Sequence, residues 1–322
     1  MSAQPTHDSV EIRDASGSVA HILTGYGFNC VRFSVATSDG PIETVWAQPG
    51  FGPGKSPLFS GIPILFPFGG RLVGNSFRWR GTQYTVTDAL VLNGNVLHGF
   101  VINRPWRVIE QADNRVVGEF HAAVDDPALL SQYPSDFRIR MRYEIGASSL
   151  ASEITVDNPG DRPLPWGFTT HGYYRLSLGG GKPEESIVKI PAGATWVLDS
   201  DVLPTGQIAP VAPENDFRGD EPLGGRSLDA IFTKLEPEAD GSVVASIDDP
   251  YAGRTLRIVS RGPFREFVVF TPEHREAVAI EPYTCAPTTF DLEERGYDAG
   301  LRILEPGQSE KMTISLHLDE TG

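Results

Sequence analysis

Alternation of apolar and polar residues is the dominant pattern along the chain, and it predicts β-strands. In residues 137–145 every odd position is apolar and every even position is charged. Residues 312–318 alternate in the same way, with the apolar side chains at even positions. Because successive side chains of a strand point to opposite faces, each segment is expected to bury one face and expose the other.

Shorter β-rich runs are distributed over the rest of the chain, and turn-forming residues separate them. They comprise residues 30–36, 106–110, 150–156, 243–247, 256–259 and 267–270. Helical pattern is confined to short pieces such as residues 127–132. Successive strands without intervening helices favour an antiparallel sandwich or barrel. We therefore predict an all-β fold, a large antiparallel β-sandwich with few short helices.

The composition agrees with this fold class. Glycine and proline account for 34 and 26 of the 322 residues. A helix interior loses about 1 kcal/mol to each Gly and about 3 kcal/mol to each Pro, so a mostly helical protein is excluded. Apolar residues make up 40% and charged residues 21%, which excludes a disordered chain. Since no low-complexity linker or fixed-period repeat interrupts the sequence, we expect one domain over residues 1–322.

Net charge and cysteine content limit the classes of binding partner and the cellular compartment that we expect for this protein. The net charge of −15 argues against nucleic acid and anionic membrane surfaces as partners. No stretch reaches the roughly 20 apolar residues that span a bilayer, and residues 1–10 lack the apolar core of a secretory signal. Cys30 and Cys285 are too few for a disulfide framework and have no metal-ligand spacing. Reduced thiols and a cytoplasmic protein are expected.

Two of the seven histidines lie in segments that suit a ligand site. His98 precedes Gly99 and His171 precedes Gly172, and a glycine beside a functional side chain lets a ligand come close. Each of the two also fits a structural histidine. The other five are interpreted as structural: His7, His21, His121, His274 and His317.

Three charged residues are further candidates. Glu281 follows the apolar run 277–280 at the expected end of a buried strand, where lost solvation would raise its pKa and suit a general base. A structural carboxylate that accepts backbone hydrogen bonds fits equally well. Asp229 has the pattern of a turn residue before a strand. Arg71 follows the kinked apolar segment 61–70, which fits a planar donor in a pocket or a surface ion pair.

Together these segments resemble the aldose 1-epimerases (galactose mutarotases) over most of the chain. The similar blocks, in the family's order, are residues 67–71, 97–100, 170–176, 227–229 and 280–284, followed by a Pro-Gly turn at 304–307. Three positions depart from the family pattern. Gly70 stands where Asn is common, Gly172 where Ser or Thr is usual, and Ala230 where a second Asp is common.

The resemblance implies a supersandwich fold with the ligand in an open cleft on the concave sheet. It also implies interconversion of the α and β anomers of a free aldohexose, without metal or redox cofactor. Glu281 would be the general base and His171 the general acid, and His98 would assist the acid near the ring oxygen. Arg71 and Asp229 would hold sugar hydroxyls.

Other functions stay open at this point. A hexose 6-phosphate substrate is the main alternative, and it would require several cations in the cleft, for which Arg78, Arg80 and Arg175 are candidates beside Arg71. A sandwich-fold glycoside hydrolase would use Glu281 and a second carboxylate, Asp229. A non-catalytic carbohydrate-binding protein would need neither proton transfer group. The protein is expected to be a monomer or a homodimer.

Overall fold

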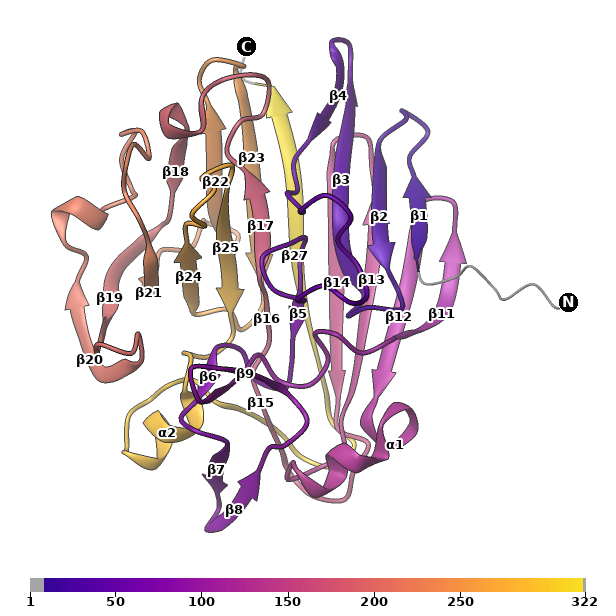
Figure 1. Cartoon of the computed structure of the whole chain (residues 1–322), viewed down its shortest axis with the longest axis vertical. Helices are drawn as coiled ribbons and strands as arrows, with labels where there is room; N and C mark the ends of the chain where they lie inside the picture. The colour runs from indigo at the N-terminus through magenta and orange to yellow at the C-terminus, as the bar shows by residue number, and fades with distance from the viewer. Residues whose placement is uncertain (1–8, 321–322) are drawn as a thin grey trace, which may run out of the picture.

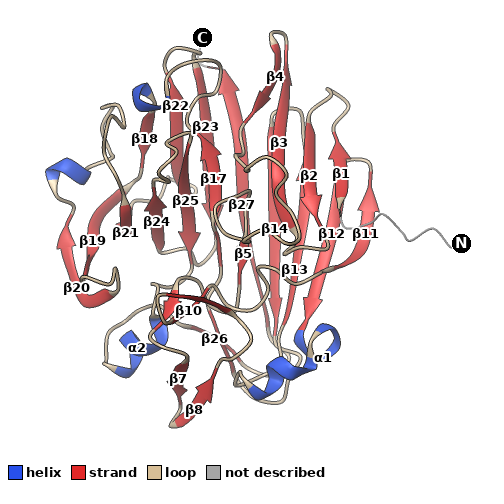
Figure 2. Ribbon diagram, viewed as in Figure 1, coloured by secondary structure: helices blue, strands red, loops and turns tan. Residues whose placement is uncertain are grey.

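The computed structural model describes residues 9–320, so the expectation for His7 and most of that for residues 1–10 lie outside it. In this range strands form the body of the molecule, and the helices are short pieces at its periphery (Figure 2). The predicted all-β class is confirmed, and the strands are paired antiparallel within large sheets. None of the helices in the described range is long and apolar enough to cross a membrane.

Two eight-stranded sheets dominate the fold, and we call them the back sheet and the front sheet after their positions in Figure 1. The back sheet has the order β11 (Arg107–Ala112), β12 (Arg115–His121), β13 (Arg138–Ile145), β14 (Ser149–Asp157), β27 (Ser309–Glu320), β23 (Arg254–Arg261), β22 (Val243–Asp249), β18 (Ile187–Lys189). The front sheet has the order β20 (Pro204–Pro210), β19 (Ala192–Leu198), β21 (Asp229–Leu235), β24 (Glu266–Phe270), β25 (Ala277–Tyr283), β16 (Thr169–Thr170), β5 (Ile64–Leu65), with β17 (Gly172–Arg175) also paired to β25.

Smaller elements extend these two layers. A four-stranded sheet lies over β11–β14 in Figure 1 and consists of β1 (Val10–Arg13), β2 (Val19–Leu23), β3 (Asn29–Thr37) and β4 (Gly40–Glu43). The remaining strands are β6 (Arg71–Leu72), β7 (Ser76–Trp79), β8 (Thr82–Thr85), β9 (Leu90–Leu92), β10 (Asn95–Leu97), β15 (Leu164–Trp166) and β26 (Arg302–Leu304). The helices are α1 (Ala122–Asp125), α2 (Thr289–Glu294) and the 3-10 turns η1 (Pro127–Ser131), η2 (Pro183–Glu185) and η3 (Pro213–Asn215).

The alternating segments form central strands of the back sheet, as predicted. In β13 the odd-numbered residues from Ile139 to Ile145 are buried and the even-numbered ones are partly exposed. β27 repeats this arrangement from Met312 to Leu318. The buried faces pack with those of the front and four-stranded sheets into one hydrophobic core. Each fully buried side chain of this size contributes about 1.5–3 kcal/mol to folding.

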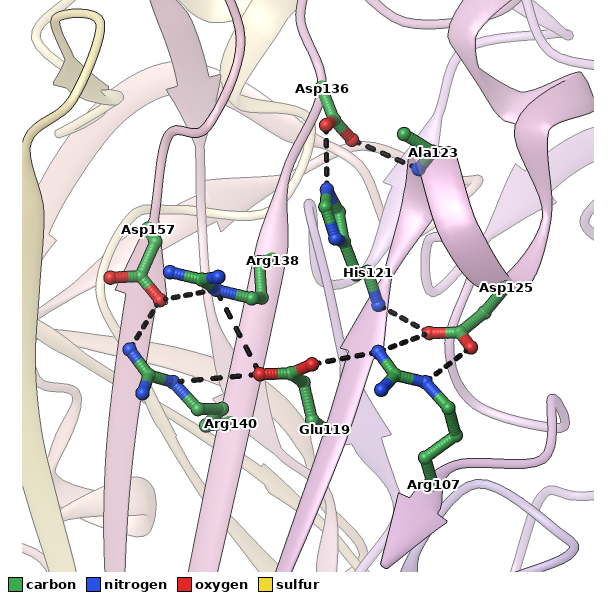
Figure 3. A network of polar contacts seen from close by, with 9 residues as sticks. All are labelled: Arg107, Glu119, His121, Ala123, Asp125, Asp136, Arg138, Arg140 and Asp157. Carbon is green, nitrogen blue, oxygen red and sulfur yellow. Dashed lines mark hydrogen bonds and ion pairs between the residues drawn. The ribbon is translucent and has the colours of Figure 1, made fainter. Parts of the chain in front are cut away.

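The other face of the back sheet carries charged residues that pair with one another (Figure 3). Asp157 accepts hydrogen bonds from Arg138 (3.1 Å) and Arg140 (2.8 Å). His121 Nε2 lies 2.7 Å from Asp136 Oδ2. In this network each side chain has a partner on a neighbouring strand or loop, so the period-two pattern accounts for both faces of the sheet.

The short helical piece predicted at residues 127–132 is present as the 3-10 turn η1, whereas α2 lies in a segment for which no helix was predicted. Two further local expectations need adjustment. The strand that contains Glu281 continues through Pro282 to Tyr283. The turn assignment of Asp229 is wrong, because Asp229 pairs with Phe270 of β24 and is therefore the first residue of β21.

Candidate active site

A pocket of about 170 Å³ opens on the face of the front sheet that points away from the back sheet. The volume suits one small molecule, since pockets for drug-sized ligands are about 300–1,000 Å³. All five residues that the sequence singled out line this pocket: Arg71, His98, His171, Asp229 and Glu281. The structure therefore brings them together, and their individual roles stay predictions.

Strand register explains why His171 and Glu281 meet. Gly172 pairs with Ile280 and Thr169 pairs with Tyr283, so the short break between β16 and β17 places His171 opposite Glu281. Directly opposed residues on one face of a sheet have Cβ atoms about 4.5–5.5 Å apart. The side chains are in contact, with His171 Nε2 3.1 Å from Glu281 Oε1.

The same register builds the rest of the pocket floor. Val268 of β24 pairs with Glu281 on its other side, and Ile231 of β21 pairs with Val268. Asp229 lies on the same face as Ile231 because the two are separated by one residue. The floor is therefore polar at β25 and largely apolar toward β21.

Burial determines the protonation of the pair. It raises the pKa of the Glu281 carboxyl well above its usual range, and the nearby Asp229 carboxylate adds to the shift. Burial also lowers the pKa of His171, because the charged imidazolium loses its hydration. At neutral pH the pair is expected to hold one proton between its two members.

His98 enters the pocket from the end of β10. It has a left-handed backbone conformation (φ 64°), and its N–H donates to the Gly70 carbonyl at 2.8 Å. Its ring meets that of His171 edge to face, with the centroids 5.6 Å apart. Burial, His171 and Arg71 all lower the pKa of His98, so it acts as a neutral imidazole. Its Nδ1 is buried and has no hydrogen-bond partner within residues 9–320.

Arg71 and Asp229 also line the pocket, and their charges act on the predicted catalytic groups: Arg71 on His98 and Asp229 on Glu281. Arg71 Nη1 donates to the Val202 carbonyl at 3.2 Å. The pKa of Asp229 is raised by burial, and the Arg71 guanidinium acts in the opposite direction. Together they offer one cationic donor and one carboxylate acceptor to a ligand.

Local packing explains two of the departures from the family pattern. Gly70 has a φ of +66°, and a Cβ there would lie 2.6 Å from the Pro287 side chain. At Gly172 a Cβ would lie 2.2 Å from the Tyr174 hydroxyl. Both glycines are therefore required by neighbours of the site, and neither change removes a side chain from the pocket.

Other lining residues were not singled out by the sequence. Phe59 and Phe270 contribute aromatic rings, and Tyr283 contributes a buried hydroxyl two residues after Glu281. Tyr173 also lines the pocket, whereas the nearby aromatic residues Trp166 and Phe100 lie in the core. In the sequence, the two tyrosines could have been identified only from their i, i+2 spacing, Tyr283 from Glu281 and Tyr173 from His171. Phe59 and Phe270 have no such signal.

Two of the three predicted catalytic groups, Glu281 and His171, are in polar contact, and the His98 ring packs edge to face on His171. A carboxylic acid and an imidazole that share a proton can remove one proton and deliver another within a single hydrogen-bonded unit. No group of three or more His, Cys, Asp or Glu residues in the described part of the chain is arranged to hold a metal ion. Cys30 and Cys285 are both buried free thiols.

Comparison with solved structures defines the class of fold. The structure matches a galactose mutarotase-like protein from Clostridium acetobutylicum with a TM-score of 0.86 at 20% identity, over 97% of this chain and 95% of that one. It matches galactose 1-epimerase from Lactobacillus acidophilus with a TM-score of 0.74 at 18% identity, over 100% and 98% of the two chains. The fold is thus that of the galactose mutarotase-like proteins.

Sequence comparison gives the family. The family model described as aldose 1-epimerase matches residues 43–317. The chain belongs to the aldose 1-epimerase family, as the ordered blocks indicated. Among curated proteins it is 24% identical over 307 residues to the uncharacterized protein YphB of Escherichia coli K12, covering 90% of this chain and 96% of that protein.

Proposed function

We propose that this protein is an aldose 1-epimerase that interconverts the α and β anomers of a free, uncharged aldohexose. The main support is the contact between Glu281 and His171, buried together at the floor of a small pocket with His98 beside them. Family membership supports the same reaction class.

The chemistry explains why a contacting acid–base pair is suitable. In a cyclic aldose the anomeric hydroxyl oxygen and the ring oxygen are bonded to the same carbon. Ring opening removes a proton from the first oxygen and adds one to the second. Glu281 would accept the hydroxyl proton while His171 donates one to the ring oxygen. The reactive form of the pair is therefore the one in which the shared proton lies on His171, although burial favours its position on Glu281.

The pair returns to its starting state when the ring closes. After opening, Glu281 holds the proton and His171 is neutral. Rotation about the bond between the first and second carbons turns the aldehyde, and the reverse transfers then produce the other anomer. His98 would bond to the sugar near the ring oxygen, and Arg71 and Asp229 would hold hydroxyls.

The charges of the pocket favour a free aldose over a hexose 6-phosphate. Among the described residues that line the pocket, Arg71 is the only Arg or Lys. Arg78 pairs with Glu294 at 3.1 Å, and Arg80 lies over the Trp79 ring. Arg175 does not line the pocket either. One arginine that already faces a carboxylate is a weak site for a phosphate dianion.

The decisive experiment is polarimetry of freshly dissolved α-D-glucose and α-D-galactose with the wild-type protein and Glu281→Gln. We expect the wild type to accelerate the approach to anomeric equilibrium and the variant to lose about 10²–10⁴-fold of that acceleration. The 6-phosphates are expected to react more slowly than the free sugars. Glycoside cleavage without anomer exchange would support a hydrolase, and sugar binding without exchange would support a binding protein.

A further inference from the structure

Phe59 is the exposed aromatic residue of the pocket that the proposed reaction leaves without a role. It belongs to the segment between β4 and β5, and its side chain is 46% exposed although it lines the pocket. A large apolar side chain left in solvent at the mouth of a polar site is a feature that a ligand would cover.

The backbone at Phe59 is strained and firmly held. Its φ is +66°, a left-handed conformation that is a true outlier for a bulky residue. The next residue, Ser60, is fully buried, its carbonyl accepts from Asn29 Nδ2 at 3.0 Å, and its hydroxyl accepts from the Gln48 N–H at 3.1 Å. Neighbouring hydrogen bonds thus maintain a conformation that is costly in itself, which is typical of functional positions.

The ring and the main chain of Phe59 contact different parts of the site. The ring lies 6.4 Å from the Tyr173 ring and 6.2 Å from the Phe270 ring, and the three form an aromatic wall. The Phe59 main chain hydrogen-bonds the Tyr173 hydroxyl. That hydroxyl is 3.4 Å from His171 Nε2, and the Tyr173 ring stacks on the imidazole at 4.7 Å.

We propose that Phe59 is a substrate-binding residue whose ring packs against the C–H face of the bound sugar. This inference rests on the proposed function. A pyranose presents hydroxyls at its rim and C–H groups on its faces, so a ring fixed at the mouth complements the polar groups of the floor. Because the ring already packs beside those of Tyr173 and Phe270, little conformational entropy is lost on binding.

Separate roles of ring and main chain make the inference testable. Phe59→Ala removes the ring but keeps the N–H that holds Tyr173. We expect the KM for D-galactose and D-glucose to rise about tenfold while kcat changes less than about twofold, because an apolar contact made equally in ground and transition states is lost. Phe59→Tyr and Phe59→Trp should restore most of the affinity.

A second variant separates binding from stability. Phe59→Gly also removes the ring, but glycine adopts a positive φ without strain, so Tm should stay equal or rise while KM rises as in Phe59→Ala. The matched control is Tyr251→Ala, an aromatic residue that is 76% exposed and does not line the pocket. It should leave both KM and kcat unchanged.

Three outcomes would overturn the inference. One is an unchanged KM in both Phe59 variants. Another is a fall in kcat with a shifted pH profile and unchanged KM, which would mean that Phe59 acts only through Tyr173 and His171. If the wild type exchanges no anomers, the proposed function fails by itself. In that case, ligand-observed NMR of the same two sugars tests whether Phe59 contributes to sugar binding. Equal binding to the wild type and to Phe59→Ala is the third outcome that would overturn the inference.

Discussion

The two large sheets of this molecule differ in how their charged and polar side chains are paired. On the back sheet, the charged side chains of the outer face neutralise one another, as Asp157 does with Arg138 and Arg140 (Figure 3). On the front sheet, charged and polar side chains enter a pocket in which His98 Nδ1 and Glu281 Oε2 have no hydrogen-bond partner within residues 9–320. Arg140 Nε on the back sheet lacks one too, but its guanidinium is bonded to Asp157 through another nitrogen. A polar group buried without a partner costs about 1–3 kcal/mol.

This difference distinguishes polar side chains that stabilise the fold from polar side chains that are available for function. A carboxylate between two arginines has its hydrogen-bonding capacity filled by the protein. Glu281 instead has one imidazole partner and a pKa that burial raises well above its usual range. Side chains of the first kind are expected to affect stability without affecting activity, and those of the second kind to do the reverse.

The largest expected effect tests that distinction with two histidines. His171→Asn should lower catalysed anomer exchange about 10²–10⁴-fold, because it removes the proposed acid, and it should leave the fold intact. The matched variant is His121→Asn on the back sheet, where His121 Nε2 lies 2.7 Å from Asp136. This control should lower Tm and leave the exchange rate unchanged. Polarimetry and thermal unfolding measure the two effects, and similar losses of activity in both variants would contradict the distinction.

A second test concerns Glu266, a fully buried carboxyl of the front sheet outside the pocket lining. Burial raises its pKa from 4.5 to about 7, against the opposing effects of Thr233, Arg265 and Trp196. The folded state therefore keeps a proton that the unfolded chain loses. Its stabilising contribution is complete below the unfolded pKa of 4.5 and is lost as pH rises through about 7.

Glu266→Gln should remove this pH dependence. Urea unfolding at about pH 5 and about pH 8 should show the variant gaining on the wild type at the higher pH, by on the order of 3 kcal/mol at most. Tyr283 pairs with Glu266 across the strands, so exchange activity is the control readout and should be retained. An equal difference between variant and wild type at both pH values would contradict the assignment.

The smallest expected effect is on the back sheet. Burial opposes ionisation of Asp157, but hydrogen bonds from Ser309, Arg138 and Arg140 outweigh it and lower its pKa. Asp157→Asn should cost about 1–3 kcal/mol at neutral pH. Since the stabilisation is present above the ordinary aspartate pKa and lost as pH falls through the lowered value, the cost should shrink in acid.

An exposed pair on the same sheet provides the control for Asp157. Arg257 donates to Asp319 at 2.6 Å, and both side chains are 44% exposed. Arg257→Ala should change the unfolding free energy by less than about 1 kcal/mol, because solvent screens such pairs. Both variants should keep wild-type anomer exchange. Equal destabilisation by the two would mean that burial does not distinguish them.

The sequence predicts the back sheet better than the front sheet for a physical reason. β13 and β27 bury one face and expose the other, so their alternation appears directly in the residue types. All seven residues of β25 are buried, and a strand covered on both faces loses that alternation. The strand was expected to end at Glu281, before Pro282, but it continues to Tyr283. Without alternation, the sequence does not show where such a strand ends.

The sequence singled out the polar residues of the candidate site but not the apolar residues that line it. Glu281, His98 and His171 are noticed because charged or titratable side chains stand out among apolar and glycine neighbours. Phe59 and Phe270 look like ordinary core residues, and only the three-dimensional structure shows that they line the pocket. The opposition of His171 and Glu281 depends on strand register, which pairs residues far apart in the sequence.

The close approach of Tyr174 to Gly172 makes these two positions interdependent in evolution. The phenol oxygen and the adjoining ring carbons of Tyr174 occupy the volume that any larger residue after His171 would need. Gly172→Ser alone should therefore be poorly tolerated, and so should its combination with Tyr174→Phe, because a ring carbon would still lie 2.4 Å from the new Cβ. Relatives with a hydroxyl-bearing residue after the second histidine are thus expected to have a non-aromatic side chain two positions later, so that the two substitutions are inherited as a unit.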